Sequence, residues 1–321
     1  MNRPGEEGIA LLTVLLLVAV LSTLAVGMLD DIRFGLRRQS NAETTAQARW
    51  YAIGAESLTA VQLARLTETD ALKRAEWNGR VFRFPIEGGA IQARLRDGTT
   101  CFNLNSVVEG AGEVLRRRER GAAQLQALLI ALDVAPRQAE MLTAALIDWI
   151  DSDQMREAGG AEDEAYGRGP RPYRTGGTLL AETSELRAIQ GFDAQTYARL
   201  RPHVCALPSP ELSPININGL AEADAPLIAM LTDGAVSPAA ARQLIAERPP
   251  AGWSAAGFWD AVKRRSDLPP SVDPGQIAVT PRFFVLETEV AYLDAEVSAS
   301  ALFEDRAGRL RLAARRWTPE E

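Results

Sequence analysis

The stretch from Ile9 to Met28 is uncharged and mostly apolar, and it lies near the N-terminal end of the chain. At a rise of about 1.5 Å per residue, a helix over these residues spans the ~30 Å hydrocarbon core of a lipid bilayer. The sequence beyond Met28 has the composition of an ordinary soluble protein. We therefore expect one membrane-spanning helix that carries a large domain outside the bilayer.

The residues around this stretch indicate what kind of membrane segment it is. A secretory signal peptide has an apolar core of about 7 to 15 residues that ends at a small-residue cleavage site. Here the apolar stretch is longer, and no such site precedes Asp30 and Asp31. A short polar leader ending in Gly8 resembles the leader of type IV prepilins and pseudopilins, which implies cleavage by a prepilin peptidase between Gly8 and Ile9. A simple N-terminal membrane anchor is the alternative.

The charges that flank the stretch bear on its orientation. Arg3 is the only basic residue before it, whereas Arg33, Arg37 and Arg38 follow it. Counted by the positive-inside rule, these residues place the bulk of the protein in the cytoplasm. The prepilin resemblance implies the opposite orientation, with the N-terminus inside and the bulk of the chain in the periplasm, and we follow the resemblance.

Composition excludes several functional classes. The net charge of −7, the pI of about 5.1 and the aromatic content of 6% are not typical of a nucleic-acid binder. With His203 as the only histidine, His-based triads and zinc clusters are disfavoured. A Cys205 nucleophile with His203 as its base is also disfavoured, because residues two apart seldom face each other on a helix. We predict no catalytic residues. Cys101 and Cys205 either pair in an oxidising compartment or remain two free buried thiols.

Periodicity predicts a long helix followed by an interrupted sheet. No proline occurs from Leu29 to about Thr67, and apolar residues such as Trp50, Ile53 and Val61 recur at mostly helical spacing. Further along, alternating patterns predict strands at Arg80–Pro85 and Ala90–Leu95 around a Glu87–Gly89 turn, and at Arg282–Ala291, Ala295–Phe303 and Arg309–Trp317, with a turn at Asp305–Gly308. The Ala295–Phe303 segment could also be helical.

These patterns predict an α+β fold in which an all-helical domain interrupts a sheet domain. The sequence between the two groups of strands, residues 103–279, reads as almost entirely helical. The expected segments are a leader (1–8), a transmembrane half-helix (9–28), an amphipathic half-helix (29–69), a sheet domain (70–102 and 280–321) and the inserted helical domain (103–279).

A weak internal repeat occurs within the insert. Asn103-Leu104-Asn105 and Asn216-Ile217-Asn218 each precede a pair of predicted helices, at Ala122–Ile150 and Ala221–Glu247. The second unit is similar to helix-hairpin-helix segments of DNA-uptake proteins, which bind phosphates through backbone amides at a glycine-rich hairpin. Here the hairpin, Thr232–Ala235, contains an aspartate and a single glycine. An alternative function is therefore a membrane-anchored periplasmic DNA-binding or uptake receptor.

The segment from Asp148 to Tyr173 is rich in carboxylates. Closely spaced carboxylates repel one another unless a cation or solvent intervenes. Asp151, Asp153 and Glu162 occupy positions 1, 3 and 12 of an EF-hand count, although Met155 and Arg156 at positions 5 and 6 exclude a true EF-hand. The loop from 152 to 181 is also longer than loops without a functional reason usually are. A hard oxygen-ligand site for calcium and a solvated acidic loop are the two interpretations.

Taken together, the chain resembles the minor pseudopilin K family of the type II (general) secretion pathway. The resemblance is carried by Gly8 with the apolar stretch, Asn103–Asn105, ALIDWIDSD, GGAEDEAYG, Pro172-Tyr173, SELRAIQGF and SPININ. It implies a type IV pilin-like fold with a helix-hairpin-helix or SAM-like insert, leader cleavage and methylation, bound calcium, and a place at the tip of the pseudopilus in a complex with the minor pseudopilins I and J. The resemblance implies no nucleic-acid partner and no enzymatic activity.

Thr13 is a departure from ordinary pilins that fits this family. Pilins usually carry a glutamate at the fifth mature position, where the N-terminal amine of a neighbouring subunit pairs with it. Counted from Ile9, that position is Thr13. An unpaired carboxylate in a bilayer costs at least ~2.5 kcal/mol, so a subunit with no neighbour above it has no use for one. The K subunits are similar in lacking it.

The resemblance also assigns ligands and a disulfide. Carried over residue by residue, it implies calcium ligands at Asp151, Asp153, Glu162 and Asp163, and further at Asp148 and Glu164. The family often has asparagine where this chain has Gly176-Gly177, so one ligand is missing or replaced by a carbonyl. A disulfide between Cys101 and Cys205 would staple the base of the insert to the sheet.

Overall fold

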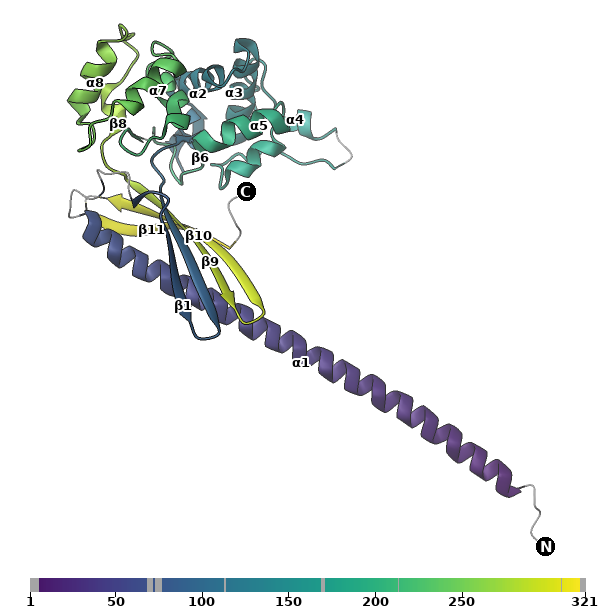
Figure 1. Cartoon of the computed structure of the whole chain (residues 1–321). Helices are drawn as coiled ribbons and strands as arrows, with labels where there is room; N and C mark the ends of the chain where they lie inside the picture. Colours follow the sequence, from purple (N-terminus) through teal and green to yellow (C-terminus); the bar gives the residue numbers. More distant parts are fainter. Residues whose placement is uncertain are drawn as a thin grey trace.

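The computed structural model describes residues 6–67, 72, 77–112, 114–168, 171–212, 214–306 and 308–317, with side chains from Leu11 onward. The start of the expected leader, the beginning of the segment from residue 70, Ala307 of the expected turn and the last four residues lie outside this part of the chain. The predicted long N-terminal helix with a small sheet is confirmed (Figure 1).

One helix dominates the shape of the molecule. Helix α1 (Glu6–Thr67) runs through 62 residues without interruption. Its N-terminal half extends alone, whereas the sheet covers its C-terminal half and the inserted domain lies beyond the sheet (Figure 1). From Leu11 the helix is long and apolar enough to span a membrane, and its most apolar window has no buried residues.

The sheet joins strands that are far apart in sequence. Its order is β1-β2-β9-β10-β11, all antiparallel, formed by β1 (Val81–Ile86), β2 (Gly89–Asp97), β9 (Phe283–Tyr292), β10 (Ala295–Arg306) and β11 (Arg309–Arg316). Strand β2 pairs with β9, so the two ends of the insert leave the sheet side by side. The Ala295–Phe303 segment is therefore strand, and the helical alternative for it is wrong.

Small side chains hold the helix against the sheet. Ala48, Ala52 and Ala55 of α1 are buried, together with Leu63 further along. Trp50 and Val61, which we placed on the apolar face from their spacing, remain exposed. The face that packs is thus the alanine face, because small residues allow close approach of a helix to the strands.

The insert has its own hydrophobic core, separate from the helix and sheet. Its helices are α2 (Glu119–Ala131), α3 (Pro136–Ile150), α4 (Asp163–Tyr166), α5 (Ala194–Leu200), α6 (Ala225–Leu231), α7 (Pro238–Ala246) and α8 (Ala255–Lys263), with 3-10 turns η3 (Leu104–Val107), η4 (Thr183–Ala188), η5 (Arg201–His203), η6 (Glu222–Asp224) and η7 (Pro274–Gln276).

The expectation of an all-helical insert is wrong. Three two-stranded sheets lie within it: β3 (Phe102–Asn103) with β6 (Val204–Cys205), β4 (Val108–Ala111) with β5 (Val114–Arg117), and β7 (Ile215–Asn216) with β8 (Ile277–Ala278). Strands β3, β6, β7 and β8 have two residues each and carry no alternating pattern, because two positions cannot define a period. Their partners are distant in sequence, whereas β4 and β5 are four-residue strands that follow each other directly in the chain.

The internal repeat is also present in the structure. Asp133 and Asp233 follow the first helix of each hairpin, with positive φ angles of 62° and 50°. The N–H of Asp133 donates to the carbonyl of Ile130, and the N–H of Asp233 donates to that of Met230. Both hairpins therefore turn in the same way.

In each unit of the repeat, an asparagine near the start forms hydrogen bonds with loops that come later in the chain. The Asn105 side-chain oxygen accepts from Leu180 N at 2.8 Å, and the Asn218 oxygen accepts from Trp253 N at 2.7 Å. Each side-chain amide then donates to two further carbonyls. The two Asn-x-Asn motifs thus fasten later loops of their own units.

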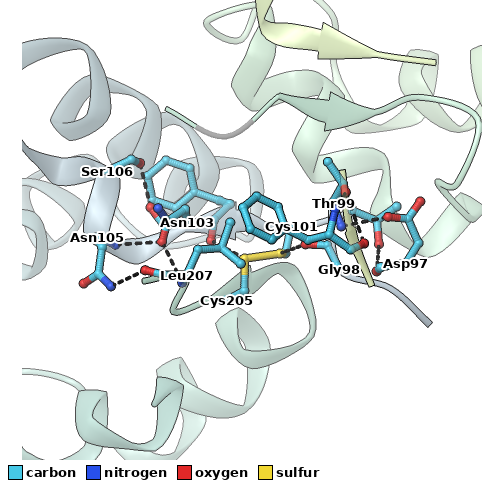
Figure 2. Close-up of a disulfide and its surroundings, with 12 residues drawn as sticks. Asp97, Gly98, Thr99, Cys101, Asn103, Asn105, Ser106, Cys205 and Leu207 are labelled. Atoms are coloured by element: carbon cyan, nitrogen blue, oxygen red, sulfur yellow. Dashed lines mark hydrogen bonds between the residues drawn. A yellow bond between two sulfur atoms is a disulfide. The ribbon is translucent and has the colours of Figure 1, made fainter. Parts of the chain in front are cut away.

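A disulfide lies where the chain passes from the sheet into the insert (Figure 2). Cys101, which follows β2, is bonded to Cys205 in β6. Next to it, Thr99 Oγ1 accepts from the backbone N–H groups of Arg282 and Phe283 at 2.9 and 3.0 Å. Both connections between sheet and insert are therefore tied together at this point.

Candidate metal centre

Three carboxylates converge where helix α3 ends. Asp151 is the C-terminal cap of α3, Asp153 lies in the loop that follows, and Glu162 is the N-terminal cap of α4. Each contributes an oxygen that lies within 4.8 Å of the other two. We call these three residues the acidic cluster. The loop reverses direction between Asp153 and Glu162. This reversal brings Asp151 and Glu162, positions 1 and 12 of the EF-hand count, close together.

The acidic cluster contains buried oxygens that accept no hydrogen bond. Both carboxylate oxygens of Glu162 and Oδ1 of Asp151 are without a partner in the described part of the chain. Buried polar atoms in folded proteins nearly always have partners, so orphaned oxygens this close to one another are suited to bind a cation. Oxygen ligands of this kind suit calcium, which takes six to eight of them. The residues therefore fit the ion that the sequence suggested.

The electrostatics agree with this interpretation. Burial, followed by the charges of Asp153 and Asp148, raises the pKa of Asp151 to about 7. Burial likewise raises the pKa of Glu162 to about 7, with Asp148 as the next contributor. Without a cation, these groups hold protons at pH values where exposed carboxylates are ionised. A bound divalent ion would remove this repulsion and favour the ionised forms.

Asp148 lies behind the acidic cluster. It is fully buried in α3, and burial raises its pKa. Its Oδ1 accepts from the backbone N–H of Glu157 at 3.0 Å, while Oδ2 has no partner. A Cβ on Gly160 would lie 2.1 Å from that Oδ2, so only glycine allows the loop to pass this close. Asp148 thus positions the loop and leaves one oxygen available near the cluster.

The structure does not bring Asp163 or Glu164 into the acidic cluster. Asp163 Oδ1 accepts from the backbone N–H and the hydroxyl of Thr175 at 2.8 and 2.9 Å, and these bonds lower its pKa. Glu164 is exposed and pairs with Arg168. Asp163 therefore fastens the returning half of the loop. Nothing local in the sequence identified Thr175 as its partner.

The returning half of the loop lies beside the end of α3. Gly177 donates its N–H to the carbonyl of Trp149 at 3.0 Å and has a positive φ of 55°. A Cβ on Gly177 would lie 3.8 Å from the carbonyl oxygen of Asp151. The Gly176-Gly177 segment is thus next to the acidic cluster, where the resemblance implied either a missing ligand or a backbone carbonyl.

His203 and Cys205 do not form a nucleophilic pair. The sulfur of Cys205 is in the disulfide with Cys101. His203 is buried, its Nδ1 lies 3.8 Å from Asp224 Oδ1, and burial lowers its pKa. Cys205 is therefore a structural residue in this state.

The α6–α7 hairpin offers no amide to a phosphate. The N–H of Asp233 donates to Met230, that of Gly234 to Ala229, and that of Ala235 to Thr232. In addition, both Asp233 oxygens accept from Arg120 Nη1 at 2.8 Å. The hairpin amides are used within the turn, and a carboxylate lies where a phosphate would have to approach. This geometry disfavours the DNA-receptor alternative.

Comparison with known proteins gives a consistent result. Family profiles described as type II secretion system (T2SS), protein K match residues 100–209 and 215–280. These ranges coincide with the two units of the insert. A type II secretion system protein K from Pectobacterium carotovorum subsp. carotovorum is 34% identical over 98% of this chain and 97% of its own length. One from Klebsiella pneumoniae is 37% identical over 78% of this chain and 77% of its own length.

A solved structure is similar as well. The chain matches one in the crystal structure of the GspK-GspI-GspJ complex from the enterotoxigenic Escherichia coli type 2 secretion system, with a TM-score of 0.73 and 28% identity. The match covers 88% of this chain and 99% of that one. The likeness therefore extends over helix, sheet and insert.

Proposed function

This chain belongs to the type II secretion system protein K family, and on that basis we propose that it is a minor pseudopilin that caps and helps to initiate the periplasmic pseudopilus. It acts as a structural, non-enzymatic subunit in a tip complex with the minor pseudopilins I and J. The neighbouring solved structure, whose title names a complex of GspK with GspI and GspJ, supports these partners.

The observation that carries this proposal is the position of the insert. The bulky inserted domain lies across the sheet from the C-terminal part of α1, away from the apolar half of the helix (Figure 1). A head of this size at the distal end would hinder another subunit from stacking above it. Thr13, in place of the usual glutamate, supports the same position, because a terminal subunit needs no acid to pair with the amine of a neighbour above.

An apolar groove offers a surface for subunit contact. It lies between α1 and β1, has a volume of about 630 Å³, and is lined by residues that include Trp50, Leu58, Phe82 and Phe84. Trp50 is 66% exposed and Leu58 is 69% exposed. Exposed aromatic and aliphatic side chains gathered in a groove are typical of interaction sites.

Co-purification tests the assembly. Full-length chain in uncharged detergent should be recovered with tagged I and J subunits of the same system. Trp50→Glu with Leu58→Glu should reduce recovery, because both charges would be buried at the contact. Val114→Glu with Ile130→Glu, at two exposed apolar residues of the insert, is the matched control. Failure of the wild-type chain to co-purify would refute the tip-complex assignment.

For localisation, we infer an inner-membrane anchor with the bulk of the chain in the periplasm. The apolar, unburied span at the start of α1 supports the anchor. We further propose cleavage by prepilin peptidase between Gly8 and Ile9. Sequencing the N-terminus of protein isolated from membranes should give Ile9 as the first residue. A mature N-terminus after Met28 would instead identify a removed signal peptide.

For the insert, we propose a helix-hairpin-helix, SAM-like scaffold that carries one calcium ion on the acidic cluster. The repeated hairpins support the scaffold, and the orphaned oxygens of Asp151 and Glu162 support the ion. Direct titration with calcium should show binding that is lost in an Asp151→Asn, Glu162→Gln double variant. Equal binding by that variant would remove the assignment.

A further inference from the structure

A large cavity is lined by residues from Gln154 to Gln190, none of which lines the groove between α1 and β1. Its volume is about 1060 Å³, at the upper end of the range typical of ligand sites. It is bounded by the loop after α3, by α4 and by η4. Helix α4 stands out to one side of the insert, on the opposite side from α8 (Figure 1).

The rim of this cavity is basic, although the protein as a whole is acidic. Four exposed arginines line it, namely Arg156, Arg168, Arg171 and Arg187, against the two carboxylates of Glu162 and Glu164. Arg168 pairs with Glu164. Among the described residues, no carboxylate lies within 4.0 Å of the guanidinium of Arg156 or Arg171, so their charges are available to a ligand. We call this site the arginine cavity.

The floor of the arginine cavity is rigid and partly apolar. The rings of Tyr166 and Tyr173 lie 5.2 Å apart, and Trp149 packs against both. The Tyr173 hydroxyl donates to the carbonyl of Ala188 at 2.8 Å, and the Tyr166 hydroxyl accepts from Gln190 N at 3.2 Å. The floor therefore needs no reorganisation when a ligand binds, which reduces the entropic cost of association.

We propose that the arginine cavity binds an acidic peptide segment of another protein. Free guanidinium groups form bidentate hydrogen bonds with carboxylates, and tyrosine and arginine are the residue types enriched where proteins recognise one another. A peptide that carries both carboxylates and apolar side chains matches the basic rim and the apolar floor together. This peptide site is additional to the role of the chain at the tip of the pseudopilus, and binding there does not require calcium.

The geometry favours a peptide over a nucleic acid. Single-stranded nucleic acids bind to a row of exposed aromatic rings, but Tyr166 is only 6% exposed, and Tyr173 is the one exposed ring among the described lining residues. Glu162 and Glu164 on the same wall, and a net charge of −7, would also repel a continuous run of phosphates. The separate carboxylates of a peptide can bind the arginines without approaching Glu162 or Glu164.

Fluorescence anisotropy tests the proposal on the full-length chain in uncharged detergent with calcium present. The probe is a labelled peptide in which glutamate alternates with alanine and tyrosine. Its binding should weaken as salt is raised, since the contacts are exposed charges. Arg156→Glu with Arg171→Glu should weaken binding by about tenfold or more, and Arg156→Gln with Arg171→Gln by a smaller factor.

A matched variant controls for net charge. Arg242→Glu with Arg264→Glu changes the charge equally at exposed positions in the second unit of the insert and should leave the affinity within about twofold of wild type. Equal weakening by both double glutamate variants, or equal binding of a lysine-containing peptide, would overturn the proposal. The same measurement is made with a labelled single-stranded oligonucleotide as the probe. If it binds more tightly than the acidic peptide and loses binding in R156E/R171E, the cavity is a nucleic-acid site instead.

Discussion

At the scale of single residues, Asp151 and Glu162 predict how stability depends on pH. Their pKa values of about 7 lie above the ordinary 3.8 and 4.5. Between about pH 4 and pH 7 the folded, metal-free chain therefore holds protons that the unfolded chain has released. The free energy of unfolding of the metal-free chain should fall as pH rises through this window. Calcium, which binds the ionised carboxylates, should then stabilise most at the upper end.

Thermal unfolding of the full-length chain in detergent measures this effect. Chelator should lower the melting temperature clearly at about pH 7.5 and only slightly at about pH 5, where protonation replaces the ion. Asp151→Asn with Glu162→Gln should abolish the difference between the two pH values, because amides do not titrate. The variant also separates this effect from carboxylates elsewhere in the chain. The same calcium effect at both pH values would contradict the assignment.

Gly160 gives a second prediction at this scale. A Cβ at this position would lie 2.1 Å from Asp148 Oδ2 and 2.8 Å from Asp148 Cγ. Gly160→Ala should therefore displace either Asp148 or the loop, lower the melting temperature and weaken the stabilisation by calcium. Gly167→Ala, in the same loop, is the control, since its nearest atom would be 3.4 Å away and its φ is −72°. Calorimetry on both variants, with and without calcium, distinguishes them.

The sequence predicted part of this site and missed the rest for identifiable reasons. The spacing of Asp151, Asp153 and Glu162 was enough to bring them together, because a loop that reverses once aligns such positions. Asp163 has the same side chain but a different role, since Thr175 supplies two hydrogen bonds to it. That partner lies across a loop without periodicity, so no pattern could identify it.

At the scale of elements, an ion pair fastens helix to sheet. Arg315 in β11 donates from Nε and Nη2 to the two carboxylate oxygens of Glu56 in α1, at 2.8 and 2.7 Å. Glu56 is buried against the sheet. The pair therefore holds the last strand onto the helix in a fixed register.

Breaking this pair should destabilise the sheet domain. Glu56→Ala leaves Arg315 without its partner, and the loss should be roughly 1–3 kcal/mol, since a charged group is left partly desolvated. Arg116→Ala is the control, because Arg116 is 76% exposed in its pair with Glu109 and such pairs contribute about 0–1 kcal/mol. Urea unfolding followed by tryptophan fluorescence measures both. Equal losses would show that the pair contributes no more than a surface contact.

The elements also show what periodicity can and cannot establish. Helix α1 and four strands of the main sheet were predicted, because each repeats its pattern over at least six residues, whereas Ala295–Phe303 was left open between strand and helix. The buried face of α1 was not predicted. The spacing of Trp50 and Val61 suggested one face, but Ala48 and Ala52 pack instead. Hydrophobicity ranks alanine below tryptophan, whereas close packing of a helix on strands requires the smaller side chain.

At the scale of the whole molecule, the hydrophobic core of the helix and sheet is separate from that of the insert. The core of helix and sheet lies beside the membrane segment, and the core of the insert lies at the far end (Figure 1). The contacts between the two parts include the disulfide, Asn216 Nδ2 donating to Asp97 Oδ2 at 2.6 Å, and the ion pair of Arg316 with Glu182 at 3.5 Å. The arginine cavity belongs to the insert, whose core is a different cluster of residues from the core that packs α1 on the sheet.

The position of the chain at the tip predicts the effect of restoring an acid at residue 13. In a subunit with no neighbour above it, the carboxylate of Thr13→Glu would have no amine to pair with, at a cost of at least ~2.5 kcal/mol within the bilayer. The variant should enter the membrane or the tip complex less well and reduce secretion. Thr13→Val, which adds no charge, should behave like wild type. Quantifying each variant in membranes and in complexes with I and J measures the effect. Normal or improved incorporation of Thr13→Glu would mean that another subunit does lie above this chain, and the cap assignment would then be wrong.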